Sequence, residues 1–357
     1  MTSKRVLIRA DASVFIGTGH VARCLTLADA LRALDVSVTF ASRGLPGNVS
    51  DRVRERGFGL IELPSAYEGE ITTTDIEAPI PWAPDVDALR AAAGGGWDAL
   101  VVDHYALDAR WEVAARRLAR RIVVIDDLAN RAHDADVLVD QSLDATAARY
   151  AARVPERCTL LLGPRFALIR PEFAMPSAAV RADGHHVLVS FGGADLPGAT
   201  FVALDALDTL PALTADIVAG ASNPAWDALV ARVHGRTEWR LHRHIADFAA
   251  AMAAADVFVG AGGGTTWERA AAGVPTVCVA VAPNQEANAE ALAAAGAHVY
   301  LGRVEALSAT RLAAAIAGLA FDPERRSTLV ARSRALVDGR GAARVAAAIR
   351  ATGQEDS

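Results

Sequence analysis

Two glycine turns in the sequence stand next to side chains that can do chemistry. The first, Gly17-Thr18-Gly19, follows the apolar run 6–8 and leads into His20, which opens a segment with apolar residues at helical spacing. Glycine lets a backbone approach a ligand closely, and the free N–H groups at the start of a helix attract anions. An imidazole there can act as a general base or acid; the simpler alternative is that His20 only caps the helix.

The second glycine turn covers residues 260–266 and follows the apolar run 257–259. The backbone N–H groups that could hold a diphosphate without a metal are those of Gly263, Gly264, Thr265 and Thr266. Glu268 follows in the first turn of the predicted helix, where a carboxylate can accept both hydroxyls of a ribose or simply benefit from the helix dipole. A nicotinamide cofactor is not expected, because the acid of a dinucleotide fingerprint lies roughly 20 residues further on.

Other candidate site residues also follow apolar runs. Asn284 and Gln285 come after the run 276–281, and their amides suit the hydroxyl and acetamido groups of a sugar, although Asn284 could instead cap a helix. In the first half, the polar residues at the ends of such runs are Arg9, Asp11, Asp103, His104, Tyr105, Asp126 and Asp127. For Asp103 and Asp126 the alternative is a capping role, and for Tyr105 it is aromatic packing.

The apolar runs predict strands, with helical patterns between them; one such helix is expected to be capped by Asp108 and to run through Leu118. In the first half these runs are 6–8, 36–40, 60–63, 98–102, 122–125, 137–139 and 159–162. In the second half they are 186–190, 216–219, 239–241, 257–259 and 276–281, and Gly192 and Gly193 follow the first of them as a further turn. Continuously apolar strands that alternate with helices indicate an α/β fold with parallel, doubly wound sheets, in which ligands bind beyond the carboxyl ends of the strands.

The periodicity breaks at residues 163–184, which predicts two domains, 1–175 and 176–357. Each half contains strands, glycine turns and helices in the same order, so we expect two Rossmann-like domains facing a central cleft. The simplest division places a nucleotide on the second domain and the reacting group on the first. Residues 64–86 are rich in proline and are predicted to form a surface excursion near the mouth of the site.

Composition narrows the class of protein. The formal net charge of −6 over 357 residues argues against a general nucleic-acid surface, which would be basic. Three widely spaced cysteines give neither a disulfide framework nor a metal pair, which is typical of the cytoplasm. No apolar stretch approaches the roughly 18 residues of a membrane span, and the N-terminus is too short for a signal peptide. A cytoplasmic monomer without metal or cofactor is expected.

Taken together, the motifs resemble one known family. They are Arg9-Ala-Asp-Ala-Ser, Gly17-Thr-Gly-His-Val-Ala-Arg23, Asp103-His-Tyr, Ile125-Asp-Asp, Leu162-Gly-Pro, Leu168-Ile-Arg-Pro-Glu-Phe173, Ser190-Phe-Gly-Gly-Ala-Asp195, Gly262-Gly-Gly-Thr-Thr-Trp-Glu268 and Asn284-Gln285. Their order over nearly the whole chain is similar to that of the UDP-2,4-diacetamido-2,4,6-trideoxy-β-L-altropyranose hydrolases of pseudaminic acid biosynthesis, a nonulosonic acid pathway.

The resemblance implies a glycosyltransferase-B type fold and metal-independent hydrolysis of a UDP-sugar to UDP and the free diacetamido sugar. The family's catalytic histidine falls on His20, and its active-site tyrosine and asparagine fall on Tyr105 and Asn284. The residues expected to bind substrate are Asp11, Gly17, Thr18, Gly19, Gly192, Gly193, Gly263, Gly264, Thr265, Thr266, Glu268 and Gln285.

Three functions are compatible with these residues. In the leading hypothesis His20 accepts a proton from water, which attacks the anomeric carbon with inversion, while the second glycine turn stabilises the leaving diphosphate. The second hypothesis is a glycosyltransferase with a UDP-amino sugar donor, which the same fold permits. The third is a non-catalytic nucleotide-sugar sensor, which gives no reason for an imidazole at the first turn.

Overall fold

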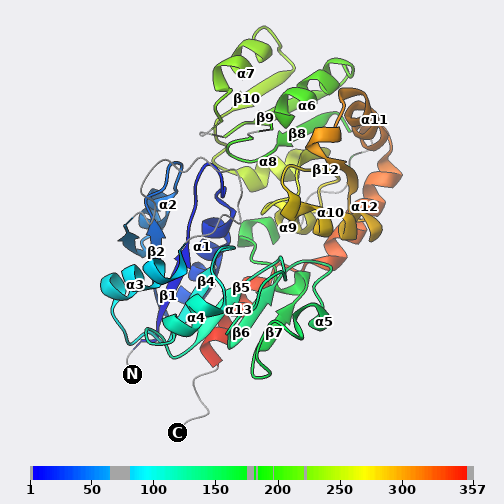
Figure 1. Ribbon diagram of the computed structural model, residues 1–357. Helices are drawn as coiled ribbons and strands as arrows, with labels where there is room; N and C mark the ends of the chain where they lie inside the picture. The colour runs from blue at the N-terminus through cyan, green and yellow to red at the C-terminus, as the bar shows by residue number, and fades with distance from the viewer. Residues whose placement is uncertain are drawn as a thin grey trace. The chain divides into compact units, whose positions relative to one another are not determined.

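The computed structural model of the chain describes residues 3–64, 81–174, 181, 184–195, 197–220 and 223–351. It divides into two compact units, each built on its own sheet (Figure 1). The first unit comprises Met1–Leu168 together with Arg340–Ser357, and the second comprises Ile169–Gly339. The two units are described separately below.

The first unit contains a seven-stranded sheet in the order β3-β2-β1-β4-β5-β6-β7, with every pair of neighbours parallel. Its strands are β1 (Arg5–Ala10), β2 (Ser37–Arg43), β3 (Gly59–Leu63), β4 (Ala99–Asp103), β5 (Ile122–Ile125), β6 (Val137–Asp140) and β7 (Thr159–Leu162). The strand order reverses between β1 and β4, which pair side by side with Ala10 opposite Asp103. In a doubly wound sheet this reversal is where a ligand binds.

Helices cover both faces of the first sheet. They are α1 (Gly19–Arg32), α2 (Ser50–Glu55), α3 (Trp82–Ala93), α4 (Ala109–Ala115), α5 (Ala147–Tyr150) and α13 (Gly341–Ala351), with a short 3-10 turn at Pro164–Phe166. Because side chains alternate along a strand, Ile8 packs with Leu27 of α1 in one core, while Leu7 packs with Leu89 of α3 and Trp111 of α4 in another. The strands are therefore apolar throughout, as buried parallel strands require.

The second unit contains a six-stranded parallel sheet in the order β10-β9-β8-β11-β12-β13. Its strands are β8 (His186–Ser190), β9 (Thr214–Val218), β10 (Trp239–His242), β11 (Val257–Ala261), β12 (Thr276–Ala280) and β13 (Val299–Arg303). Counted within the unit, this is the 3-2-1-4-5-6 order of a Rossmann sheet. Its reversal lies between β8 and β11, the two strands that precede glycine turns.

The second sheet is also covered on both faces. Its helices are α6 (Ala199–Asp208), α7 (Trp226–Val233), α8 (Phe248–Ala254), α9 (Thr266–Ala272), α10 (Glu286–Ala294), α11 (Ala309–Ala320) and α12 (Pro323–Leu336), and its 3-10 turns are Pro171–Ala174, Pro283–Gln285 and Val304–Ala306. Val189 packs into the core shared with α6 and α11, whereas Leu188 packs against Phe258 and Met252 on the other face. The predicted α/β class with two doubly wound parallel sheets is confirmed.

The observed units differ in two places from the predicted division at residues 175 and 176. Residues 169–174 belong to the second unit, and the end of the chain from Arg340 belongs to the first. The second difference arises from α13, whose Val345 and Ile349 pack into the same core as α1. The sequence of an alanine-rich helix does not indicate which sheet the helix packs against, so the position of α13 could not be inferred from the sequence.

Three local predictions also differ from the structure. The predicted surface excursion at 64–86 lies outside the described residues from 65 to 80, and its last part, from Trp82, is the beginning of α3. The sixth strand of the second sheet, β13, was not predicted, because Val299–Arg303 is only partly buried and contains a glycine. The helix predicted from Asp108 does begin there, with the Asp108 carboxylate accepting from the Arg110 N–H, but it ends at Ala115.

Candidate active site

His20 does not cap the first helix. Thr18 occupies the N-cap of α1, and the imidazole of His20 is buried, with Nδ1 2.6 Å from Oδ1 of Asp103 at the end of β4. An ionised carboxylate can only accept, so this contact places the ring proton on Nδ1. In the neutral form of the ring, the lone pair is then on Nε2, from which a histidine can take a proton from water.

Tyr105 lies beside the imidazole. The two rings meet edge to face, with their centroids 4.6 Å apart and their planes at 81°. Tyr105 comes from the same loop after β4 as Asp103, so this loop fixes the histidine on two sides. The adjacent His104 is also buried, and its Nδ1 accepts from the N–H of Ala106, which stiffens the loop.

Asp103 is fully buried, and His20 is only one of its partners. Arg23, one turn along α1, donates to both of its carboxylate oxygens at 2.6 Å and to Asp127 Oδ2 at 2.8 Å. Burial alone would raise the pKa of Asp103, but Arg23 and then His20 hold that pKa well below its usual range. Asp103 is therefore a permanent anion within the site, and a capping role for it is excluded by these contacts.

Asp11, a predicted substrate ligand, lies inside the first unit. Its carboxylate is fully buried and receives Nη1 and Nη2 of Arg9 at 2.5 and 2.8 Å and the backbone N–H of Arg43 at 2.8 Å. Arg9 and Arg43 also bind Asp85, which in turn accepts from the indole N–H of Trp111. This network joins β1 and β2 to α3 and α4, so the structure places Asp11 in a framework behind the strand ends.

The first glycine turn combines one constrained position and one open position. Gly17 has φ +78° and donates its N–H to the carbonyl of Ser13 at 2.8 Å, so a side chain there would be strained. Gly19 is exposed, and a Cβ added to it would meet no atom within 4 Å. The turn therefore reaches the surface directly before the buried imidazole.

Asp126 and Asp127 point into different networks. Asp126 accepts from Arg131 at 2.7 Å, from the N–H of Ala129 at 2.8 Å and from the hydroxyl of Tyr150 at 3.0 Å. The same hydroxyl lies 2.9 Å from Asp140, whose pKa burial raises to about 6. Since a phenol has one proton, the Tyr150 hydroxyl can donate to only one of these two carboxylates at a time. Capping of the 126–129 turn is thus only part of what Asp126 does.

The second glycine turn is shaped by close packing. A Cβ on Gly260, at the end of β11, would lie 2.1 Å from the carbonyl oxygen of Ser190 in β8, so only glycine fits. The side-chain oxygen of Gln285 accepts from the N–H of Gly262 at 3.1 Å and from that of Val281 at 3.0 Å. Gln285, predicted to bind the sugar, therefore ties the turn to the end of β12.

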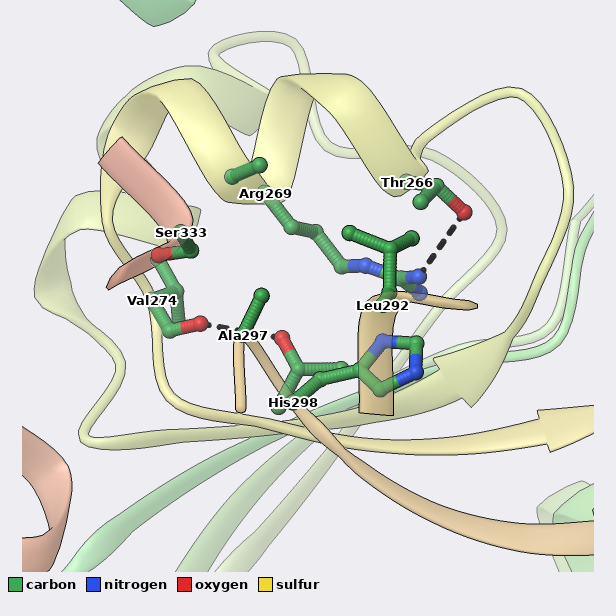
Figure 2. A pocket seen from close by; sticks show the side chains of 9 residues that line it. Thr266, Arg269, Val274, Leu292, Ala297, His298 and Ser333 are labelled. Atoms are coloured by element: carbon green, nitrogen blue, oxygen red, sulfur yellow. Dashed lines mark hydrogen bonds between the residues drawn. The ribbon is translucent and has the colours of Figure 1, made fainter. Parts of the chain in front are cut away.

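Arg269 lies beneath the second turn. Its guanidinium donates to the carbonyl of Ala261 at 2.7 Å and to the hydroxyl of Thr266 at 3.0 Å, which joins the two ends of the turn, as Figure 2 shows for Thr266. The side chain is 2% exposed, and within the described residues no carboxylate oxygen lies within 4 Å of its nitrogens. Burial lowers the pKa of Arg269, and the neighbouring Cys278 and Glu268 oppose that change only in part.

The predicted diphosphate cradle is smaller than four N–H groups. The N–H of Thr266 already donates to the carbonyl of Gly263 at 3.0 Å, and Thr265 is the N-cap of α9. The N–H groups of Gly263, Gly264 and Thr265 remain as candidates, and Gly264 is exposed. A buried cation behind these groups adds positive potential to the turn.

Glu268 has a partner that the sequence did not reveal. Its Oε1 accepts from Nε of Arg170 at 2.8 Å, and Arg170 also lies over the ring of Phe173. Burial raises the pKa of Glu268, and Arg170 opposes that change. This hydrogen bond fixes the orientation of the carboxylate. Among the other predicted ligands, Asn284 is half-buried in the Pro283–Gln285 turn.

Gly192 and Gly193 are exposed at the end of β8, beside the second turn's strand β11. Gly192 has φ +97°, and the carbonyl of Gly193 would lie 2.3 Å from a Cβ on Gly220.

Within the described ranges, no group of three or more His, Cys, Asp or Glu side chains has metal-binding geometry. In the same part of the chain, no helix is long and apolar enough to cross a membrane.

Comparison with known proteins places this architecture among the glycosyltransferase-B type folds. The structure of MurG from Acinetobacter baumannii aligns with a TM-score of 0.66 at 17% identity, over 98% of this chain and 99% of that one. At this identity the likeness shows the fold alone. The sequence pattern of the glycosyltransferase family 28 C-terminal domain matches residues 226–345.

Two curated proteins are similar in sequence. One is the spore coat polysaccharide biosynthesis protein SpsG of Bacillus subtilis, 28% identical over 190 residues, which are 52% of this chain and 56% of that protein. The other is the UDP-2,4-diacetamido-2,4,6-trideoxy-β-L-altropyranose hydrolase of Campylobacter jejuni, 26% identical over 193 residues, 54% of this chain and 61% of the relative. The resemblance predicted from the motifs is confirmed, and the alignments span little more than half of each relative.

Several residues of the site were not predicted. Arg23 and Arg170 stand within the quoted motifs without a role, and Asp85 lies in the region expected to be a surface excursion. A buried charge needs an opposite charge, so Arg9 and Arg43 at the ends of two strands were the available signal for an acid such as Asp85. Spacing along the chain does not reveal which acid it is.

Proposed function

We propose that this chain is an enzyme of nucleotide-sugar metabolism that hydrolyses a UDP-linked 2,4-diacetamido-2,4,6-trideoxy sugar to UDP and the free sugar. The observation that carries the proposal is the His20–Asp103 pair, with Nδ1 2.6 Å from Oδ1 at the strand reversal of the first sheet. The substrate class is supported by the similarity to the Campylobacter jejuni hydrolase. Under this proposal the enzyme serves a nonulosonic acid pathway.

His20 is the base. Its Nε2 takes a proton from water while the water oxygen bonds to the anomeric carbon, and the bond from that carbon to the β-phosphate oxygen breaks. The electron pair leaves with UDP, which is a good leaving group and needs no strong general acid. Attack on the face opposite the leaving oxygen inverts the anomeric centre. Tyr105 positions the imidazole, and Asn284 is proposed to bind the sugar.

The second unit holds the UDP moiety. The N–H groups of Gly263, Gly264 and Thr265 donate hydrogen bonds to the diphosphate, and Arg269 behind them stabilises the charge that grows on it. Glu268, oriented by Arg170, accepts the ribose hydroxyls. No metal is required for this step, because backbone N–H groups and a guanidinium supply the positive potential.

A glycosyltransferase is the second candidate, favoured by the match of residues 226–345 to the family 28 domain. It would use the same donor site with a hydroxyl acceptor in place of water. Incubation of the purified chain with synthetic UDP-diacetamido sugars, with and without acceptor sugars, separates the two. Release of free sugar without acceptor supports hydrolysis, transfer supports the alternative, and tight binding without turnover indicates a sensor.

The bond that breaks is tested by one turnover in ¹⁸O-labelled water. Carbon–oxygen cleavage places the label in the sugar and leaves UDP unlabelled. Attack at phosphorus would normally need a metal or a cationic clamp on the phosphoryl oxygens. Label in the β-phosphate of UDP, or release of UMP and a sugar 1-phosphate, would contradict the proposed mechanism.

A further inference from the structure

Arg23 connects Asp103, the partner of His20, to a second carboxylate. Its Nε and Nη2 bind the two oxygens of Asp103, and its Nη1 binds Asp127 Oδ2. The Arg23 side chain is 11% exposed, so water screens these charges weakly. Nη2 also lies 3.3 Å from His20 Nδ1, which places a permanent positive charge directly beside the imidazole.

Other titratable groups of the first unit face this network. From α1, Cys24 points its Sγ at Asp103 Oδ2 from 3.5 Å, and burial raises the pKa of its thiol. From the loop after β4 come Tyr105, in ring contact with His20, and His104, whose pKa burial lowers. The thiol and the His104 imidazole are thus uncharged at neutral pH.

On the side of β6, Asp140 is the remaining acid. Burial is the main cause that raises its pKa to about 6, and the charge of Asp127 adds to that effect. The charged side chains that the structure links to His20, directly or through one shared partner, are Asp103, Arg23 and Asp127, and Asp140 adds a negative charge above its pKa of about 6. The Arg23 guanidinium is the positive charge of this group.

We propose that Arg23 balances the charge of the His20–Asp103 pair and so keeps the imidazole unprotonated, able to take a proton from water, at neutral pH. The inference rests on the proposed function, in which His20 is the base. Arg23 acts through His20 and Asp103 and is a positioning residue: it sets the orientation and the protonation of the base from behind.

The physical reason is competition for one carboxylate. A buried aspartate alone beside a histidine stabilises the protonated ring, and a protonated ring cannot act as a base. The guanidinium occupies both oxygens of Asp103 and removes most of that attraction, while its own charge opposes a second proton on the ring. A planar fork that binds two oxygens at once is specific to arginine, since lysine offers a point charge.

The test follows the imidazole itself. Titration of His20 by ¹⁵N NMR, with its signal identified from the spectrum of His20→Asn, gives the pH at which the ring is half protonated. In Arg23→Gln this pH should rise by about 1 to 3 units, the usual effect of one nearby charge on a pKa. The acid limb of the kcat/KM profile should rise equally, so turnover lost at pH 7 returns at higher pH. A merely structural role would lower turnover at every pH.

The opposite change sharpens the test. Asp127→Asn removes a negative charge but leaves Arg23 in place, so the half-protonation pH should fall. Arg149→Gln is the matched control, because Arg149 forms a comparable part-buried pair with Asp144 at 2.6 Å in the same unit. It should leave the titration of His20 unchanged. Should Arg23→Gln fail to fold, Asp127→Asn and Arg23→Lys carry the test.

An unchanged half-protonation pH in folded Arg23→Gln, or a rise in Asp127→Asn, would overturn the inference. The titration is measured without substrate, so it remains informative if the proposed function fails. Full turnover in His20→Asn would remove His20 as the base, whereas the NMR shift would still show whether Arg23 controls its protonation. The two failures are therefore distinguishable.

Discussion

The two glycine turns of this molecule have the same local structure but present different chemical groups. Each follows a central strand of a parallel sheet and begins a helix, at β1 and α1 in the first unit and at β11 and α9 in the second. The first turn is followed by ionic side chains that bind one another, with His20, Arg23 and Asp103 in contact. The second presents backbone N–H groups above Arg269, a buried arginine with no carboxylate oxygen of the described residues within 4 Å of its nitrogens.

Under the proposed function, the two turns divide two tasks. The side chains at the first turn position the base, His20, and are already bound to one another. A buried cation without a close anion is costly to the protein, and a bound diphosphate would relieve that cost. We therefore expect substitutions at the first turn to affect the chemical step and substitutions at the second to affect binding of UDP.

The largest effect is expected for His20→Asn. Asparagine keeps a polar side chain against Asp103 but has no basic nitrogen, so turnover should fall by at least about 10²-fold, while UDP binding is largely kept. Steady-state kinetics and calorimetric titration with UDP give both values.

The matched control for that variant is His133→Asn. His133 is also buried and holds Glu112 at 2.7 Å, and it comes from the loop between β5 and β6, not from the first glycine turn. Its loss should lower stability and leave turnover per folded molecule unchanged. Near-normal turnover in His20→Asn would exclude the histidine as the base.

The division of tasks could be predicted from the sequence only in part. The strand-like runs, the glycine turns and His20 are local features, and local periodicity places them correctly at the carboxyl ends of parallel strands. The pairing of Arg23 with Asp103, 80 residues further along, is not local. The same holds for Asp85, which binds Arg9, and for Gln285, whose side-chain oxygen accepts from the backbone of the turn.

A smaller effect is expected for Glu268→Ala. Loss of a charged hydrogen-bond acceptor for the ribose should weaken UDP binding by about 1.5–3 kcal/mol. A 2′,3′-dideoxyribose analogue lacks the partner hydroxyls, so the loss should be smaller for it. Calorimetric titration of both ligands against both proteins measures the difference.

Glu172→Ala controls for the partner of Glu268. Glu172 lies 3.5 Å from Arg170 and is about half exposed, so its removal changes the surroundings of Arg170 without removing the proposed ribose ligand. UDP binding should stay within about 0.5 kcal/mol of the natural chain, as for most surface changes. Equal losses for UDP and its analogue in Glu268→Ala would mean that Glu268 acts through folding.

Two alanine substitutions compare the turns directly. In Gly260→Ala the new Cβ collides with the backbone of Ser190, so the free energy of unfolding should fall by about 1–3 kcal/mol, as in other overpacked cores. In Gly19→Ala the new Cβ meets open space, and stability should be unchanged within about 0.5 kcal/mol. If substrate approaches the first turn, Gly19→Ala should nevertheless lower kcat/KM. Thermal unfolding and kinetics together separate the two, and equal destabilisation would contradict the packing argument.

The smallest expected effect is that of metal removal. Magnesium bound to a diphosphate uses carboxylates whose oxygens face the ligand, but Asp126 and Asp127 are engaged by Arg131 and Arg23. The second turn supplies N–H groups and the charge of Arg269 instead, so excess EDTA should leave kcat and KM unchanged. A rate that collapses in EDTA and returns with Mg²⁺ would show that the diphosphate is neutralised by a metal. It would point to Asp126 and Asp127 as ligands of the metal, and the contrast between a paired first turn and a second turn that attracts anions would then no longer hold.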